Sequence, residues 1–105
     1  MKKALCVGID CYEYINDLHG CVNDANEVKS ALERNGDGSL NFEVKLLSAT
    51  SETTYITRRE LKDSIQSLFN TESEIALLYF AGHGSFDALG GYLCTSEVKN
   101  PDDGL

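Results

Sequence analysis

The sequence predicts an α/β fold, in which a mainly parallel sheet carries helices on both faces. Three short apolar runs of strand length, at 4–9, 42–47 and 75–80, alternate with two segments of helical periodicity, near 23–34 and 58–69. This alternation is typical of parallel strands joined by right-handed crossovers. No repeat, low-complexity tract or linker interrupts the 105 residues, so they form one domain at most.

The first half of the chain supplies a strand and a helix. Ala4–Ile9 is a continuous apolar run, the pattern of a strand covered on both faces. Either Asn23 or Asp24 is expected to cap a helix that continues to about Arg34, and the Asn-Gly-Asp-Gly turn at 35–38 ends it.

The second half repeats this order. Strand character returns at 42–47, and Thr57 with Glu60 forms a capping box that begins the second helix. Ile75–Phe80 is predicted to be the most deeply buried strand, and Gly91–Thr95 to be a short further strand. We expect the first and third strands to be neighbours, so that the loops after them meet beyond their carboxyl ends.

The composition excludes several classes of function. The formal net charge of −8 disfavours binding to nucleic acid or to an anionic membrane surface, both of which need clustered Lys and Arg. No segment is long and apolar enough to be a secretory signal or a membrane span. The four cysteines lack the paired spacing of a zinc site, and the chain is predicted to be cytoplasmic with reduced thiols.

Two loop segments carry residues suited to chemistry. His83 lies between two glycines directly after the third apolar run, where glycines permit a sharp turn and close approach of a substrate backbone. The alternative is a histidine that only fills a turn. The second segment, Leu-His-Gly-Cys-Val-Asn-Asp-Ala at 18–25, would by itself be an ordinary helix start.

Together the two segments resemble the metacaspase and prokaryotic caspase-like cysteine peptidases. The matching motifs are Leu-x-Gly-Cys-x-Asn-Asp-Ala at 18–25, Tyr-Phe-Ala-Gly-His-Gly at 79–84, and an opening Val-Gly-Ile followed by Tyr12 and Tyr14. The resemblance implies a caspase-like three-layer α/β sandwich, of which residues 1–105 are the N-terminal portion. It also implies a polypeptide substrate.

The resemblance assigns roles to individual residues. His83 matches the catalytic histidine, and the backbone N–H of Gly84 matches the oxyanion-hole donor. Asp24, with Cys21 and Ala81, matches a pocket for the residue before the scissile bond, where a carboxylate suits Arg or Lys. Leu18 replaces the arginine that true caspases use to bind aspartate. Asp24 could instead be only a helix cap, or serve in both roles.

The resemblance also suggests residues that could bind an activating calcium ion. Asp102 and Asp103 resemble paired acids that help bind activating calcium in some metacaspases, and no cofactor is otherwise required. A hard cation needs more oxygen ligands than two carboxylates supply. A solvated acidic loop is the alternative.

The nucleophile of such a peptidase is expected outside these residues. It lies about 50 residues beyond the histidine, whereas only 22 residues follow His83, since 105 − 83 = 22. None of the four cysteines fits that role. We therefore expect this chain to act with the remainder of a peptidase domain, and a non-catalytic α/β interaction module (a pseudo-peptidase) is the alternative.

Overall fold

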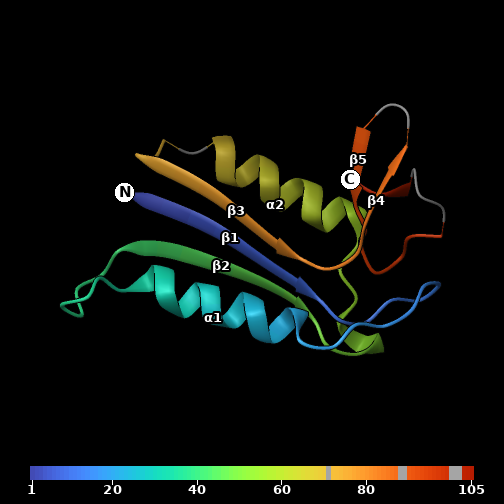
Figure 1. Ribbon diagram of the computed structural model, residues 1–105. Helices are drawn as coiled ribbons and strands as arrows, with labels where there is room; N and C mark the ends of the chain where they lie inside the picture. The colour runs from blue at the N-terminus through green and yellow to red at the C-terminus, as the bar shows by residue number, and fades with distance from the viewer. Residues whose placement is uncertain (71, 88–89, 100–102) are drawn as a thin grey trace.

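The central feature of the fold is a parallel sheet with strand order β2-β1-β3 (Figure 1). A computed structural model describes residues 1–70, 72–87, 90–99 and 103–105. The three strands are β1 (Lys2–Ile9), β2 (Phe42–Ala49) and β3 (Ile75–Ala81), and β1 pairs in parallel with both others. The predicted adjacency of the first and third strands is confirmed.

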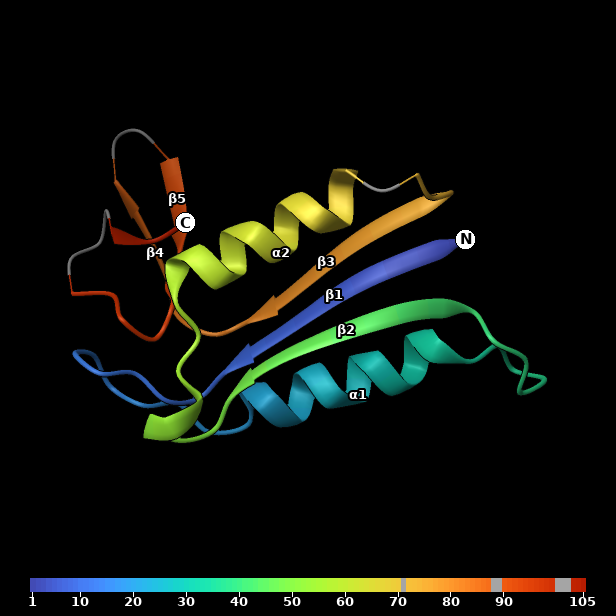
Figure 2. The ribbon, with the colours of Figure 1, turned by 180° about the vertical axis from the view of Figure 1, so that it is seen from behind.

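Two helices cover opposite faces of this sheet, as predicted. The helices are α1 (Cys21–Glu33) and α2 (Arg58–Asn70), and the two opposed views in Figures 1 and 2 place them on either side. Alternate side chains of β1 divide between them because strand residues alternate in direction. Leu5, Val7 and Ile9 join a core with residues of α2, whereas Gly8 lies against α1.

Gly8 lets α1 approach the sheet closely. A Cβ atom at this position would lie 2.7 Å from the carbonyl oxygen of Cys21 and 2.7 Å from the Cα of Val22. These contacts are with backbone, which cannot move aside like a flexible side chain. The glycine therefore fixes the start of α1 against the carboxyl end of β1.

The prediction that the third strand is the most deeply buried is wrong. Residues 4–9 of β1 are all buried, whereas Ile75 in β3 is 44% exposed and the rest of β3 is half-buried. The reason is position in the sheet, since β1 has a neighbour on each side. Within the described ranges, β3 has a strand partner on one side only.

The predicted cap of the first helix is also wrong. Asn23 and Asp24 lie inside the first turn of α1, and Gly20 at the N-cap makes no side-chain cap hydrogen bond. Instead, the Asp10 carboxylate at the end of β1 accepts hydrogen bonds from the N–H of Cys21 (2.9 Å) and of Val22 (3.4 Å). A carboxylate in this place satisfies free N–H groups and complements the helix dipole.

The Thr57 half of the capping box predicted for the second helix is confirmed. The hydroxyl of Thr57 accepts a hydrogen bond from the N–H of Glu60 at 3.1 Å. The first helix ends one residue before Arg34, and Gly38 in the following turn adopts φ of 86°, which favours glycine. A short 3₁₀ helix, Glu52–Thr54, precedes α2.

A β-hairpin follows β3 and forms its own two-stranded sheet. Its strands are β4 (Gly84–Asp87) and β5 (Gly90–Leu93), paired antiparallel. The predicted short strand at 91–95 is thus present but begins and ends earlier, and β4 was not predicted. Four residues that include Gly84, Ser85 and Asp87 give little apolar signal for a strand.

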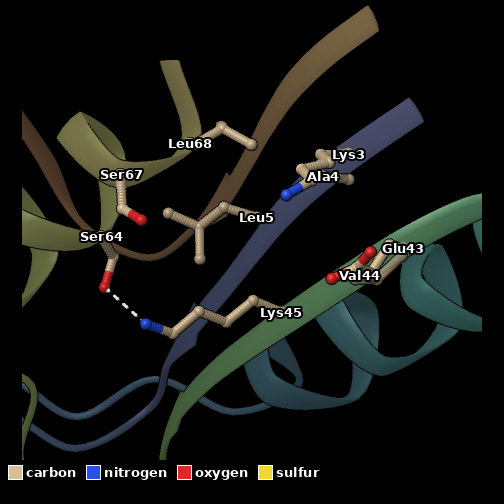
Figure 3. A pocket seen from close by; sticks show the side chains of 9 residues that line it. All are labelled: Lys3, Ala4, Leu5, Glu43, Val44, Lys45, Ser64, Ser67 and Leu68. Carbon is tan, nitrogen blue, oxygen red and sulfur yellow. Dashed lines mark hydrogen bonds between the residues drawn. The ribbon is translucent and has the colours of Figure 1, made fainter. Parts of the chain in front are cut away.

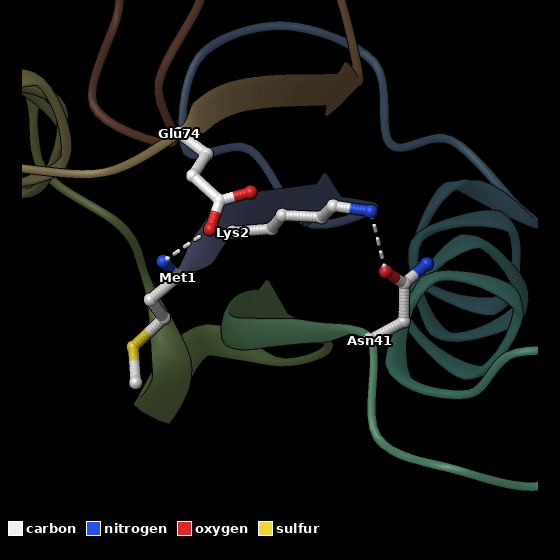
Figure 4. Close-up of polar contacts among 4 residues, drawn as sticks. All are labelled: Met1, Lys2, Asn41 and Glu74. Atoms are coloured by element: carbon white, nitrogen blue, oxygen red, sulfur yellow. Dashed lines mark hydrogen bonds and ion pairs between the residues drawn. The ribbon is translucent and has the colours of Figure 1, made fainter.

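Polar contacts tie the amino ends of the three strands together (Figure 4). The N-terminal ammonium of Met1 pairs with the Glu74 carboxylate at 3.2 Å, just before β3. On the other side, Lys2 Nζ donates to the side-chain oxygen of Asn41 at 3.1 Å, just before β2. No helix in the described part of the chain has the length and apolarity required to cross a membrane.

Candidate active site

The loop after β1 is folded tightly against the carboxyl edge of the sheet. The N–H groups of Asp10 and Cys11 both donate to the carbonyl of Ala49, at the end of β2. The N–H of Leu18 returns to the carbonyl of Asp10 at 2.8 Å, which closes the loop. Although its sequence is mostly polar, the loop buries Cys11 and Tyr12, so it is part of the packed structure.

Tyr12 of this loop holds the backbone of His83. The N–H of His83 donates to the Tyr12 hydroxyl at 2.8 Å, and the two rings meet edge to face with centroids 4.8 Å apart. A Cβ atom at Gly82 would lie 2.7 Å from the same hydroxyl, so only glycine leaves Tyr12 this space. The loops after β1 and β3 therefore meet at His83, as the strand order requires.

A backbone carbonyl orients the imidazole of His83. Its Nε2 atom lies 2.8 Å from the carbonyl oxygen of Asn16. A carbonyl oxygen can only accept, so Nε2 carries the proton in this hydrogen bond. In the neutral ring Nδ1 is then unprotonated, and it is the nitrogen available to take a proton from another group.

Tyr12 remains a neutral donor and acceptor over the ordinary pH range. Burial raises the pKa of its hydroxyl to about 12, and the hydrogen bond from His83 offsets only part of that effect. The negative charges that Cys94, Cys21 and Asp10 would carry raise the Tyr12 pKa further. The Tyr12 hydroxyl is therefore protonated when it accepts the hydrogen bond from the His83 N–H.

The N–H of Gly84 is directed away from the hairpin ladder. Gly84 lies opposite Leu93, but the N–H and carbonyl of Leu93 both bond to Leu105. In an antiparallel ladder, facing residues alternate between hydrogen-bonded pairs and pairs whose peptide groups point outward. Because Leu93 bonds outward, Gly84 belongs to a pair of the second kind, and its N–H is left for another acceptor.

A cavity of about 340 Å³ opens beside His83. Its polar lining includes the thiol of Cys94, which contacts the Ser85 hydroxyl at 3.8 Å. Lys99 lies at the rim with its ammonium 4.5 Å from the centre of the Tyr14 ring. The lining residues are Ile15, Asn16, His83, Gly84, Ser85, Cys94, Val98 and Lys99.

Two of the residues expected to form the substrate pocket, Cys21 and Asp24, lie in the first turn of α1. Cys21 is the first residue of α1, and burial together with the carboxylates of Asp10 and Asp24 raises its pKa. Ala81 ends β3 in register with Gly8, the glycine that contacts Cys21. Asp24 is exposed. None of these expected pocket residues is among the described residues that line the cavity beside His83.

Of the two acidic residues expected to help bind calcium, Asp103 lies among the residues that the structure describes. Asp103 accepts a hydrogen bond from the N–H of Lys99 at 3.3 Å, whereas Asp102 lies outside the described residues. Among the described residues, no group of three His, Cys, Asp or Glu side chains is placed to hold a metal ion.

Comparison with known proteins decides the family. The family model of the caspase domain matches residues 1–101, which is nearly the whole chain. The chain belongs to the caspase-domain family. Its strand order, with a histidine loop beyond β3, is consistent with part of a caspase-like domain.

The curated relatives of this caspase domain are metacaspases. Metacaspase-1 of Candida albicans is 36% identical over 86 residues, which cover 79% of this chain and 19% of that protein. Metacaspase-4 of Arabidopsis thaliana is 32% identical over 88 residues, covering 80% and 21%. Metacaspase-1 of Plasmodium falciparum is 34% identical over 90 residues, covering 80% and 14%. The chain therefore matches about a fifth or less of these relatives, and no solved structure matches it.

Three contributors to this site carried no clear signal in the sequence. Asn16 acts through its backbone carbonyl, so any residue with the same backbone could serve. Asp10 follows the first apolar run and lies far from the helix start in sequence, so its place there did not indicate that it caps α1. Tyr12 carried the family resemblance, but nothing in the sequence showed that its hydroxyl reaches His83.

Proposed function

We propose that this chain supplies the histidine half of a Cys–His dyad in a cysteine endopeptidase. The nucleophilic thiol would come from a segment outside these residues. The observation that carries the proposal is the 2.8 Å hydrogen bond between His83 Nε2 and the Asn16 carbonyl. It holds the ring in a fixed orientation with Nδ1 as the free base, which a dyad requires.

The proposed reaction begins with proton transfer from the thiol to Nδ1 of His83. The thiolate attacks the substrate carbonyl, and the outward N–H of Gly84 donates a hydrogen bond to the resulting oxyanion. Nδ1 then returns the proton to the leaving amine as the C–N bond breaks. Water, deprotonated by the same nitrogen, hydrolyses the thioester and restores the thiol. Removing one oxyanion donor typically costs 10²–10³ in kcat.

We also propose cleavage after Arg or Lys. Asp24 is an exposed carboxylate in the first turn of α1, close enough to Cys21 to raise its pKa. Ala81 lies at the same carboxyl edge, where a small side chain leaves room for a long substrate side chain. This pocket would form on the α1 side of His83, separate from the cavity that Cys94 lines.

The decisive experiment uses both histidines of the chain. In the protein that carries this chain and the nucleophile, His83→Ala should abolish cleavage of an Arg peptide while leaving the melting temperature near wild type. His19→Ala is the matched control, because His19 is exposed and does not line the cavity. It should retain the wild-type rate.

Two outcomes would overturn the proposal. Wild-type activity in the His83→Ala variant would remove the histidine from catalysis. Absence of activity in the unmodified protein with every peptide tested would favour the alternative, a non-catalytic interaction module. Cys94 lines the cavity beside His83, so Cys94→Ser tests a nucleophile within this chain; we expect it to leave the rate unchanged.

We also propose that Asp103 contributes to activation by calcium. No step of the reaction above depends on a metal ion. Calcium titration of the active protein, compared with an Asp103→Asn variant, would detect a contribution from this carboxylate. A calcium response that is the same in both proteins would place the ion elsewhere.

A further inference from the structure

The outer side of β2 is a long open strand edge. In the described chain, β2 pairs with β1 and has no strand neighbour on its other side. Its eight residues present a row of backbone N–H and carbonyl groups, which is a template for another strand. Proteins protect such edges by shortening or covering them or by placing charged side chains on them, and β2 is uncovered but carries exposed Glu43 and Lys45.

Hollows flank the first half of this edge on both sides. One, of about 180 Å³, lies between β2 and α2, and its lining includes Leu5, Lys45 and Leu68 (Figure 3). The other, of about 390 Å³, lies beside Leu40, which is 74% exposed. Glu43 and Val44 line both hollows. Side chains of an added strand point alternately to its two faces, so they would lie in turn on the α2 side and on the α1 side of this edge.

Glu43 and Lys45, the charged residues of β2 on the α2 side of the edge, make no ion pair in the described part of the chain. Lys45 shares this side with Leu5, and its Nζ donates to the Ser64 hydroxyl of α2 at 3.2 Å (Figure 3). Glu43 also lies on this side and is exposed. It is in register with Lys3 of β1, but no ion pair within 4.0 Å joins them in the described chain.

A second copy of β2 can pair Glu43 of one copy with Lys45 of the other in one antiparallel register only. When two copies pair antiparallel about Val44, each Glu43 lies opposite the Lys45 of the other copy. Shifting the centre to Glu43 or to Lys45 would place two like charges opposite each other, which is unfavourable. In the favoured register Phe42 lies opposite Leu46 on the other face, so apolar residues also meet.

We propose that β2 is a self-association surface, through which two copies of this chain join their sheets in antiparallel register about Val44. A two-fold interface brings the same patch of both subunits together, and the pattern Glu43–Val44–Lys45 is complementary to itself. The described strands of the two copies would form one continuous sheet with the two β2 strands side by side, and each His83 loop would follow β3, the strand at the opposite side of β1 from β2. This surface is independent of the peptidase proposal.

Two charge-reversed variants test the proposal in the natural protein that contains this chain. Sedimentation or light scattering should show a concentration-dependent dimer for the wild type. Glu43→Lys gives one copy cations at both positions, and Lys45→Glu gives the other anions at both. Each variant alone should dimerise at least about tenfold more weakly, because two attractive cross-strand pairs become repulsive.

Mixing the two variants supplies the decisive measurement. Every charged position then faces its opposite, so a mixture should form a heterodimer with about the wild-type affinity. Melting temperatures of each variant check that both fold. A monomeric wild type at every concentration overturns the proposal, as does dimerisation of the single variants at wild-type strength. Failure of the folded mixture to associate also overturns it, and would assign any wild-type dimer to another surface such as the β3 edge.

Discussion

Asp24→Ala separates the substrate-pocket role of this residue from helix capping. Because Asp10 accepts the free N–H groups of α1, loss of the Asp24 carboxylate removes only its interaction with the helix dipole. That interaction is worth about 0.3–1 kcal/mol. Asp10→Ala removes the cap itself and should cost about 0.5–2 kcal/mol in the free energy of unfolding.

The effect of Asp24→Ala on cleavage depends on how far the substrate excludes water. If the guanidinium of a bound Arg peptide and the Asp24 carboxylate are both desolvated, truncation costs about 2–5 kcal/mol. This corresponds to a loss of roughly 30-fold to several thousand-fold in kcat/KM. If the pair stays exposed, as Asp24 is in the free chain, the cost is about 0.2–1 kcal/mol, or less than about sixfold.

The assay compares kcat/KM for an Arg peptide and for the same peptide with Gln in place of Arg. Asn23→Ala is the matched control, since Asn23 is an exposed neighbour in the same helical turn. We expect only Asp24→Ala to reduce the Arg preference, by more than about tenfold. An equal loss for both peptides, or an unchanged preference, would refute the pocket. A larger stability loss for Asp24→Ala than for Asp10→Ala would refute the capping assignment.

Three further results are expected from the structure. The pKa of Tyr12 is raised from 10 to about 12 in the folded chain. The stability that the protonated Tyr12 contributes is therefore complete below pH 10 and is lost as the pH rises towards 12. This loss should reach up to about 3 kcal/mol in the free energy of unfolding. Denaturant unfolding at both ends of that window should show this loss in the wild type and not in Tyr12→Phe. The same Tyr12→Phe variant leaves the His83 N–H without its acceptor. At neutral pH this should lower the free energy of unfolding by about 1–3 kcal/mol, measured by denaturant unfolding. An unchanged free energy of unfolding would mean that this hydrogen bond is dispensable. Gly8→Ala should lower stability by at least about 1–3 kcal/mol through the backbone clash with α1, while Gly36→Ala, which meets nothing within 4 Å, should not; equal melting temperatures would contradict the close packing.

The sheet could be predicted because its signals are local. Each apolar run had strand length, each helix had apolar residues at helical spacing, and alternation of the two indicated parallel strands joined by crossovers. Burial could not be ranked in the same way. Ile75–Phe80 is the more hydrophobic run, but β1 is more deeply buried because it occupies the central position. Position in a sheet depends on how strands pair, which apolarity alone does not determine.

The site was predictable to the extent that it rests on a motif. His83 was singled out by its place between glycines after a strand, and the loop that meets it followed from strand order. The Asn16 carbonyl and the Tyr12 hydroxyl reach His83 across 67 and 71 residues of sequence. Such long-range contacts are created by the packed loop, and no spacing rule anticipates them. Capping of α1 was predicted for Asn23 or Asp24 and not for Asp10 for a related reason, since Asp10 lies 11 residues before the helix that it caps.

The exposed β3 edge has a consequence for biosynthesis. During translation, β3 and its half-buried apolar residues leave the ribosome before any later segment can pair with them. Among the described residues, no strand pairs with the outer side of β3, and Ile75 on β3 is 44% exposed. A nascent chain that pauses after this hairpin would be vulnerable to aggregation and a target for chaperones that bind exposed apolar strands.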